Sequence, residues 1–240
     1  MKIEYFEDYQ TLSFAASGLV HRELQDKPDL VLCTASGNSP TGVYRDLVSK
    51  FNDRPSDFSH LRIVKLDEWG GIPLSDPNSC ETYLKTELVD PLGIEQDHYI
   101  SFNSEAKDRD LECARIAAWL KDNGPIDCCV LGLGLNGHIA FNEPATWLKP
   151  FCHIAELSQT SLQHTMATGM KVTPGYGLSL GMAEILQSRK IILLITGSNK
   201  SQIAEQFLTA KILTQLPASF LWLHPNVSCM VDKKYSKSEF

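Results

Sequence analysis

The sequence predicts a single α/β domain with a doubly wound, mostly parallel sheet flanked by helices. Apolar segments at 30–33, 126–131 and 190–195 are too short for helices and have the composition of strands covered on both faces. Predicted helices alternate with such strands, which indicates parallel pairing through crossover connections. The 240 residues fit one core and contain no linker-like stretch, so one domain is expected over residues 1–240.

The predicted elements follow in order along the chain. The first helix covers 9–24, where apolar residues recur at helical spacing on one face. We expect strands at 30–33, 62–66, 98–100, 126–131, 190–195, 219–224 and 228–231, and further helices at 43–51, 79–87, 108–121, 178–186 and 201–211. A loop is expected at 67–73 and a polar tail at 232–240.

Composition and charge narrow the function classes. Hydrophobic residues make up 43% of the chain, as in ordinary globular proteins, yet no apolar run is long enough to cross a bilayer. The first eight residues are polar and acidic, unlike a secretory signal, so we expect a cytoplasmic protein. The net charge of −7 argues against nucleic acid and anionic membranes as partners, but it permits a small phosphorylated ligand. The seven cysteines form no paired C-x-x-C motif and are expected to be reduced core thiols.

The strand at 126–131 leads into a glycine-broken loop that carries histidine, asparagine and glutamate. Its three glycines, which let the backbone turn and approach a ligand closely, are Gly132, Gly134 and Gly137. His138 and Glu143 are five residues apart, so they can meet only across the loop, as a unit suited to proton transfer. Two alternatives remain open at this point: a structural histidine in a tight turn, and a dinucleotide site, although no G-x-G-x-x-G opens a helix here.

Two other loops between a strand and a helix have small residues suited to phosphate binding. The first covers 34–42 and lacks the Gly-Lys-Ser/Thr of a Walker A loop, so an ordinary strand-to-helix turn is the alternative. The second covers 196–200 and ends in Lys200, which opposes the helix dipole unless an anion lies between them. A solvated lysine is the alternative here.

Adjacent carboxylates at Asp67 and Glu68 follow the strand at 62–66. This position suggests acid–base chemistry or a metal, and we discount the metal because no histidine or aspartate cluster stands beside the pair. One of the two carboxylates could instead cap the helix that is expected near Ser79. If the sheet is parallel and doubly wound, all four loops converge on one crevice at the carboxyl ends of the strands.

Four segments resemble the signature segments of the glucosamine-6-phosphate deaminase family, and the resemblance spans nearly the whole chain. They are 35–40 (ASGNSP), 66–69 (LDEW), 133–144 (LGLNGHIAFNEP) and 196–200 (TGSNK). Further segments look most like the galactosamine-6-phosphate deaminase/isomerase branch, namely 65–69 (KLDEW), 80–82 (CET), 91–93 (PLG), 208–211 (LTAK) and 217–224 (PASFLWLH). The resemblance implies a Rossmann-like fold of the sugar-phosphate isomerase type.

The resemblance also implies a reaction, an aldose–ketose isomerisation with loss of ammonia. His138, oriented by Glu143, would open the sugar ring, and Asp67 would move a proton from C2 to C1. Galactosamine 6-phosphate would give tagatose 6-phosphate, or glucosamine 6-phosphate would give fructose 6-phosphate. Such an enzyme, a galactosamine-6-phosphate isomerase-like hydrolase, takes a small phosphorylated amino sugar and needs no cofactor and no metal. The implied phosphate cradle consists of Ser36, Gly37, Asn38, Ser39 and Lys200.

This chain departs from some family members at two places in the site. Asn136 stands in the catalytic segment where several relatives carry aspartate, and an amide can hydrogen-bond but cannot act as a base. Relatives also have an arginine that helps to hold the phosphate, whereas residues 161–168 (SLQHTMAT) contain none. His164 and Lys171 are the two candidates to replace it.

A third departure concerns regulation. Allosteric relatives bind an N-acetylated sugar phosphate through residues just after the Asn-Glu-Pro string, including an arginine and a lysine. Here Trp147 replaces a small hydroxyl residue, and His153 and Ala155 stand in place of the two cations. Losing two charged phosphate contacts would weaken such a site at least about a hundredfold, so we expect hyperbolic kinetics.

Two other functions remain possible from the sequence. A 6-phosphogluconolactonase shares the fold and a similar Gly-His segment, but it would not need the Asp67 loop in this form. A non-catalytic sugar-phosphate sensor is the second, although this chain has neither room for a DNA-binding segment nor the basic charge for one. The sequence leaves the subunit number and the preferred C4 epimer open.

Overall fold

A seven-stranded sheet in which every pairing is parallel forms the centre of the structure. Across it the strands are ordered β1 (Lys2–Phe6), β10 (Val227–Asp232), β9 (Lys190–Ile195), β6 (Cys128–Gly132), β2 (Val31–Thr34), β3 (Arg62–Lys65) and β5 (Tyr99–Ile100). This computed structural model describes residues 1–233. The predicted tail overlaps β10 at Asp232, and residues 234–240 lie outside the described part.

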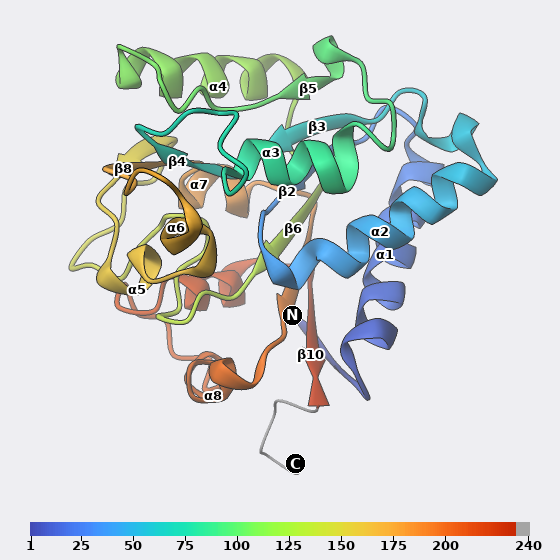
Figure 1. The fold of residues 1–240 in the computed structure, drawn as a ribbon. Helices are drawn as coiled ribbons and strands as arrows, with labels where there is room; N and C mark the ends of the chain where they lie inside the picture. Colours follow the sequence, from blue (N-terminus) through green and yellow to red (C-terminus); the bar gives the residue numbers. More distant parts are fainter. Residues whose placement is uncertain (234–240) are drawn as a thin grey trace.

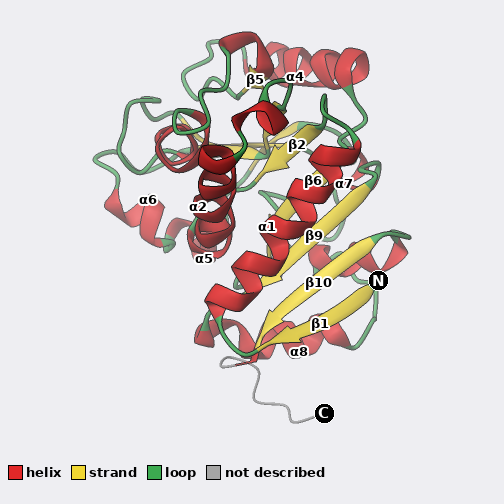
Figure 2. Cartoon of the chain, turned by 90° about the vertical axis from the view of Figure 1, so that its right-hand side faces the viewer, coloured by secondary structure: helices red, strands yellow, loops and turns green. Residues whose placement is uncertain are grey.

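Neighbouring residues of the central strands enter separate cores on the two faces of the sheet. In β6, Val130 packs into one core and Leu131 into the other, which explains why the strand reads as a continuous apolar run. The helices that contribute to the Val130 core include α1 (Tyr9–Asp26) and α2 (Asn38–Asp53), and those that contribute to the Leu131 core include α4 (Arg109–Asn123), α7 (Met182–Leu186) and α8 (Ser201–Leu208). Figure 2 shows α1 crossing in front of β9 and β10. The predicted doubly wound α/β fold is therefore confirmed.

A smaller antiparallel sheet lies beside the first and is ordered β4 (Asp67–Gly70), β8 (Tyr176–Ser179) and β7 (His153–Ala155) (Figure 1). Only Leu66 separates β3 from β4. The loop predicted at 67–73 is wrong over its first four residues, because their backbone pairs with β8. Asp67 therefore begins a strand, opposite Ser179.

Three further differences from the predicted elements have physical causes. The helix expected at 178–186 begins in strand β8 and continues into the short α7, because residues 177–179 of the buried β8 pair with strands on both sides. The strand expected at 219–224 is part of the 3-10 helix η5 (Pro217–Leu223), in which Leu223 is 62% exposed and cannot face a second layer. Strand β1 was not predicted, because it is a short edge strand in which no residue is buried and the apolar residues do not alternate strictly with polar ones.

The remaining elements are short, and α2 begins five residues before the predicted start at Val43. They are η1 (Pro55–Phe58), α3 (Cys80–Leu84), the π-helical turn η2 (Lys85–Val89), η3 (Gln96–His98), α5 (Gln159–Leu162), α6 (Thr165–Gly169) and η4 (Ser198–Lys200). Among the helices of residues 1–233, none is long and apolar enough to span a membrane.

Candidate active site

A cavity of about 350 Å³ opens at the carboxyl ends of β2, β3, β6 and β9. From β2 the chain continues to its neighbour β3, whereas from β6 it continues to β9, which lies in the opposite direction across the sheet. The strand order therefore reverses between β2 and β6. Open α/β sheets bind their ligands at this reversal. The four segments expected to converge on one crevice all contribute residues to the cavity wall, and the one at Asp67 does so from strand β4.

Asp67, the first residue of β4, places its carboxyl on the wall of this cavity while only 8% of the residue is exposed. Burial, and then the charge of Glu68, raise its pKa to about 7, and Lys65 and a hydrogen bond from Cys80 offset part of that effect. A carboxyl with a pKa near neutrality can both accept and return a proton.

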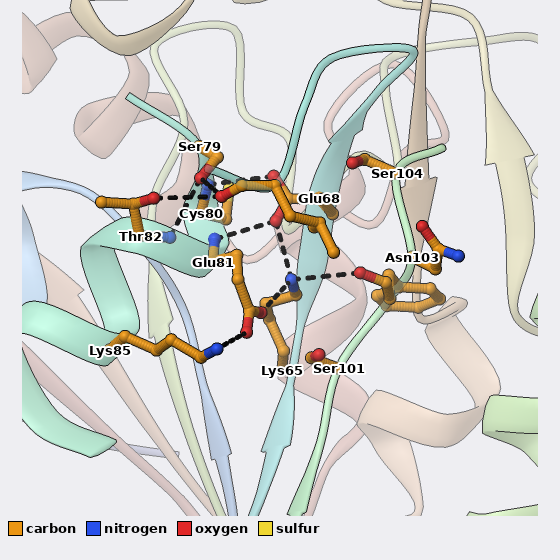
Figure 3. Close-up of polar contacts among 12 residues, drawn as sticks. Lys65, Glu68, Ser79, Cys80, Glu81, Thr82, Lys85, Ser101, Asn103 and Ser104 are labelled. Atoms are coloured by element: carbon orange, nitrogen blue, oxygen red, sulfur yellow. Dashed lines mark hydrogen bonds and ion pairs between the residues drawn. The ribbon is translucent and has the colours of Figure 1, made fainter. Parts of the chain in front are cut away.

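A buried ionic network surrounds Lys65, two residues before Asp67 in the chain (Figure 3). The Nζ of Lys65 donates to Glu68 Oε2 at 2.7 Å and to Glu81 Oε2 at 2.8 Å. Burial would lower the pKa of Lys65, but the two carboxylates outweigh it and raise that pKa. Glu68 also accepts hydrogen bonds from the backbone amides of Trp69, Cys80 and Glu81. The network therefore anchors the strand that carries Asp67.

His138 and Glu143 meet across their loop, with Nδ1 of the ring 3.2 Å from Glu143 Oε2. Ser161 Oγ donates to Glu143 Oε1 and lies 3.3 Å from the same ring nitrogen. Burial would raise the pKa of Glu143, but hydrogen bonds and the charge of His138 lower it to about 2. His138 lines the cavity, and engagement of its Nδ1 leaves Nε2 available for a bound molecule.

Asn136 contacts both Glu143 and the backbone of His138, and it is not part of the cavity wall in the described structure. Its amide donates to Glu143 Oε2 at 2.8 Å and to Ser158 Oγ at 3.1 Å, while its Oδ1 accepts from the backbone amide of His138. These contacts fix the Glu143 carboxylate and the loop. Asn136 is therefore placed to position Glu143 and the loop that carries His138.

The opposite end of the cavity gathers donors around Lys200. Lys200 Nζ donates to Ser39 Oγ at 3.3 Å, and Ser39 is joined to Thr196 at 2.7 Å. Burial lowers the pKa of Lys200 to about 8. The predicted cradle residues line the same wall, namely Ser36, Gly37, Asn38 and Ser39. Gly37 has φ of 104°, a conformation that favours glycine, and it directs the chain into the start of α2.

Of the two candidates to replace the missing arginine, the structure brings only His164 to the cavity. Its ring carbon Cε1 would lie 3.9 Å from a Cβ added at Gly37, so it stands beside the cradle. Burial, and then the charges of His138 and Lys200, lower the pKa of His164. Lys171 is exposed and does not line the cavity.

Several cavity residues were not predicted as site residues, among them Trp69 and Cys80, although both lie in segments that carry the family resemblance. A possible metal-holding group of Glu95, Asp97 and His98 lies outside the cavity and holds no buried carboxylate. The prediction of a metal-free and cofactor-free reaction stays a prediction.

Comparison with known proteins adds to this geometry. The family model for glucosamine-6-phosphate isomerases/6-phosphogluconolactonase matches residues 12–229. The chain belongs to this family. Within the glucosamine-6-phosphate isomerase/6-phosphogluconolactonase family, it is 43% identical over 232 residues to a putative deaminase, AgaI, of Escherichia coli K12, covering 96% of this chain and 91% of that protein. It is 34% identical to the glucosamine-6-phosphate deaminase of Bacillus pumilus, covering 98% of both.

Solved structures of the family give the same architecture. A monomeric glucosamine-6-phosphate deaminase superposes with a TM-score of 0.93 at 32% identity, covering 98% of both chains. The 6-phosphogluconolactonase of Trypanosoma brucei superposes with a TM-score of 0.75 at 23% identity, covering 98% of this chain and 97% of that one, and this likeness concerns the fold alone. The resemblance drawn from the sequence motifs is confirmed.

Proposed function

We propose that the protein is an amino-sugar-6-phosphate deaminase/isomerase. One observation carries the proposal: a buried carboxyl with a pKa of about 7 and a histidine–glutamate pair share one cavity with a buried lysine. The products would be tagatose 6-phosphate or fructose 6-phosphate, from galactosamine or glucosamine 6-phosphate respectively, together with ammonia.

In the proposed reaction, His138 transfers a proton between the anomeric hydroxyl and the ring oxygen, which opens the ring. Glu143 stabilises the protonated ring and keeps Nε2 directed to the sugar. Asp67 then takes the proton from C2 to give an enolamine and returns it to C1. Water adds to the resulting imine carbon at C2 as ammonia leaves, and in this sense the reaction is hydrolytic.

The phosphate would bind at the other end of the cavity. Lys200 supplies a charge, and the loop at 36–39 supplies hydroxyl and backbone donors at the start of α2. We assign the place of the arginine to His164, which becomes a cation when a dianionic phosphate favours its protonated form. The predicted cytoplasmic location stays a prediction.

A lactonase is the second candidate, because the family name includes 6-phosphogluconolactonase. The deaminase is favoured by Asp67, since lactone hydrolysis requires no base at C2. It is also favoured by three relatives of at least 30% identity, each of which is named a deaminase.

The test is an ammonia-release assay on galactosamine 6-phosphate and glucosamine 6-phosphate, run beside hydrolysis of 6-phosphogluconolactone. We expect stoichiometric ammonia and ketose phosphate from at least one amino sugar, and no acceleration of lactone hydrolysis. Lactone hydrolysis without ammonia release would reject the proposal in favour of the lactonase. Binding of the sugars without turnover of any would indicate a sensor.

A further inference from the structure

Cys80 is a buried thiol that lies between the phosphate side of the cavity and the carboxyl of Asp67. It is the first residue of α3, is 1% exposed and lines the cavity. Its Sγ lies 3.9 Å from Asp67 Oδ1 and accepts a hydrogen bond from Ser36 Oγ at 2.9 Å. The thiol therefore touches both a predicted cradle residue and the proposed base.

The thiol can donate but cannot act as a nucleophile at neutral pH. Burial, followed by the charges of Glu68 and Asp67, raises the pKa of Cys80 well above its usual value. The neutral S–H group is a weak donor, and the Asp67 carboxylate is its acceptor. The backbone amide of Cys80 donates to Glu68 Oε1 at 2.9 Å, which holds the thiol in place (Figure 3).

We infer that Cys80 is a positioning residue for Asp67, whose Oδ1 it holds through S–H donation so that Oδ2 is left to accept the proton from the sugar. Within residues 1–233, this thiol is the one side chain that hydrogen-bonds to the Asp67 carboxyl. Its second contact, with Ser36, couples the position of the carboxyl to the loop that receives the phosphate. The inference rests on the proposed function, in which Asp67 is the base.

Other titratable groups also face Asp67, and the test must separate their effects from that of Cys80. They are Glu68 on the same strand, Lys65 on β3, Cys33 on β2, Tyr44 on α2, and His138, His164 and Lys200 across the cavity. Substitution of the thiol changes none of them directly. Burial is the largest cause of the raised Asp67 pKa, so a shift that an alanine variant shows and a serine variant does not show reports the lost hydrogen bond.

The experiment measures the pKa of Asp67 by carbon-13 NMR of aspartate carboxyl carbons, with the signal assigned by its loss in Asp67→Asn. We expect Cys80→Ala to raise this pKa by roughly 0.5–1 unit, because the carboxylate loses its donor. The serine variant Cys80→Ser retains a hydroxyl donor and should return the pKa to the parent value or below it. Cys128→Ala removes a buried thiol of β6 outside the cavity and should leave the Asp67 signal unchanged.

Activity gives the second readout. The acid limb of kcat/KM should move to higher pH in Cys80→Ala, with about a three- to tenfold loss at pH 6 that lies mainly in kcat. Equal Asp67 titrations in the parent and Cys80→Ala, or equal shifts in the alanine and serine variants, would overturn the inference. If the parent releases no ammonia, the proposed function fails, while the NMR titration still decides whether the thiol holds Asp67.

Discussion

Asp67 ionises less readily in the folded protein than in the unfolded chain, because burial raises its pKa from 3.8 to about 7. The native state therefore binds this proton more tightly than the unfolded state. Ionisation of the carboxyl destabilises the fold progressively as the pH rises from about 4 to about 7, and the penalty is constant above that range. A residue that is prepared for proton transfer thus lowers the stability of the protein at neutral pH.

The substitution Asp67→Asn tests both effects together. It should abolish ammonia release, since an amide keeps the shape and loses the base, and it should raise the free energy of unfolding at pH 8 by about 1–3 kcal/mol. The gain should shrink at pH 4, where the parent carboxyl is protonated. Urea unfolding at the two pH values measures it, with exposed Asp97→Asn as the control. Turnover within about tenfold of the parent would remove Asp67 from the role of base.

His138→Gln separates ring opening from the later steps. The variant loses the titrating ring that Glu143 holds at 3.2 Å, so its rate on the closed sugar should fall far more than its rate on an open-chain analogue. Steady-state kinetics on both substrates give the comparison. Similar losses on the two would place His138 in enolisation or in the scaffold instead.

Lys200 should set the alkaline limit of substrate binding. Burial lowers its pKa to about 8, so the side chain becomes neutral as the pH rises through this value, and KM should increase. The arginine of Lys200→Arg keeps its charge and should extend binding to higher pH. Lys200→Ala should raise KM at pH 7 about 10- to 150-fold, which corresponds to a loss of roughly 1.5–3 kcal/mol in binding free energy. The exposed Lys211→Ala is the matched control. A KM that does not respond to either Lys200 variant would put the phosphate elsewhere.

At the scale of elements, the strands of the large sheet were predictable because β2, β6 and β9 are buried on both faces and read as apolar runs. The small sheet was not, because β4, β7 and β8 are four residues long or less and depend on partners distant in the chain. A run such as 178–186 reads equally well as a helix until the pairing partner is known.

The same distinction applies to the site. The loops after β2, β6 and β9 were predictable, since parallel strands bring their carboxyl ends to one edge. The thiol of Cys80 and the Lys65–Glu81 ion pair were not predictable, because these contacts join α3 to β3 and β4. How a short helix packs against two strands is set by the tertiary fold and has no signal in the local sequence. The choice of His164 over Lys171 likewise depends on how α5 and α6 fold back over the cavity.

Gly134 in the loop after β6 makes room for the imidazole ring of His138. A Cβ at this position would lie 2.1 Å from His138 Cδ2 and 2.4 Å from its Nε2, so Gly134→Ala should displace the imidazole. We expect kcat on the closed sugar to fall roughly 10- to 100-fold. The midpoint temperature of thermal unfolding should change little, because the substitution lies in a loop. Gly175→Ala is the control, since an added Cβ meets no atom within 4 Å there. A variant with parental kcat would mean that the ring adjusts without loss.

At the scale of the whole molecule, the predicted absence of allosteric control concerns the surface after the Asn-Glu-Pro string. Trp147 is 66% exposed there, and Ala155, which stands in place of a cation, is buried. We expect the dependence of rate on substrate to be hyperbolic and unaffected by millimolar N-acetylgalactosamine or N-acetylglucosamine 6-phosphate. Steady-state rates with and without each compound, with sedimentation to establish the subunit number, test this expectation. A sigmoidal curve that either compound makes hyperbolic would require a second, coupled site.

The Lys65 network also restricts how this protein can change by mutation. Loss of Lys65 alone leaves the buried carboxylates of Glu68 and Glu81 without their shared cation, which costs about 3–5 kcal/mol, a large part of the roughly 5–15 kcal/mol that holds a domain folded. Only joint replacement of Lys65, Glu68 and Glu81 by apolar residues would avoid that intermediate. These three positions are therefore epistatic, and a lineage that carries this network can exchange it only through further changes that compensate the first.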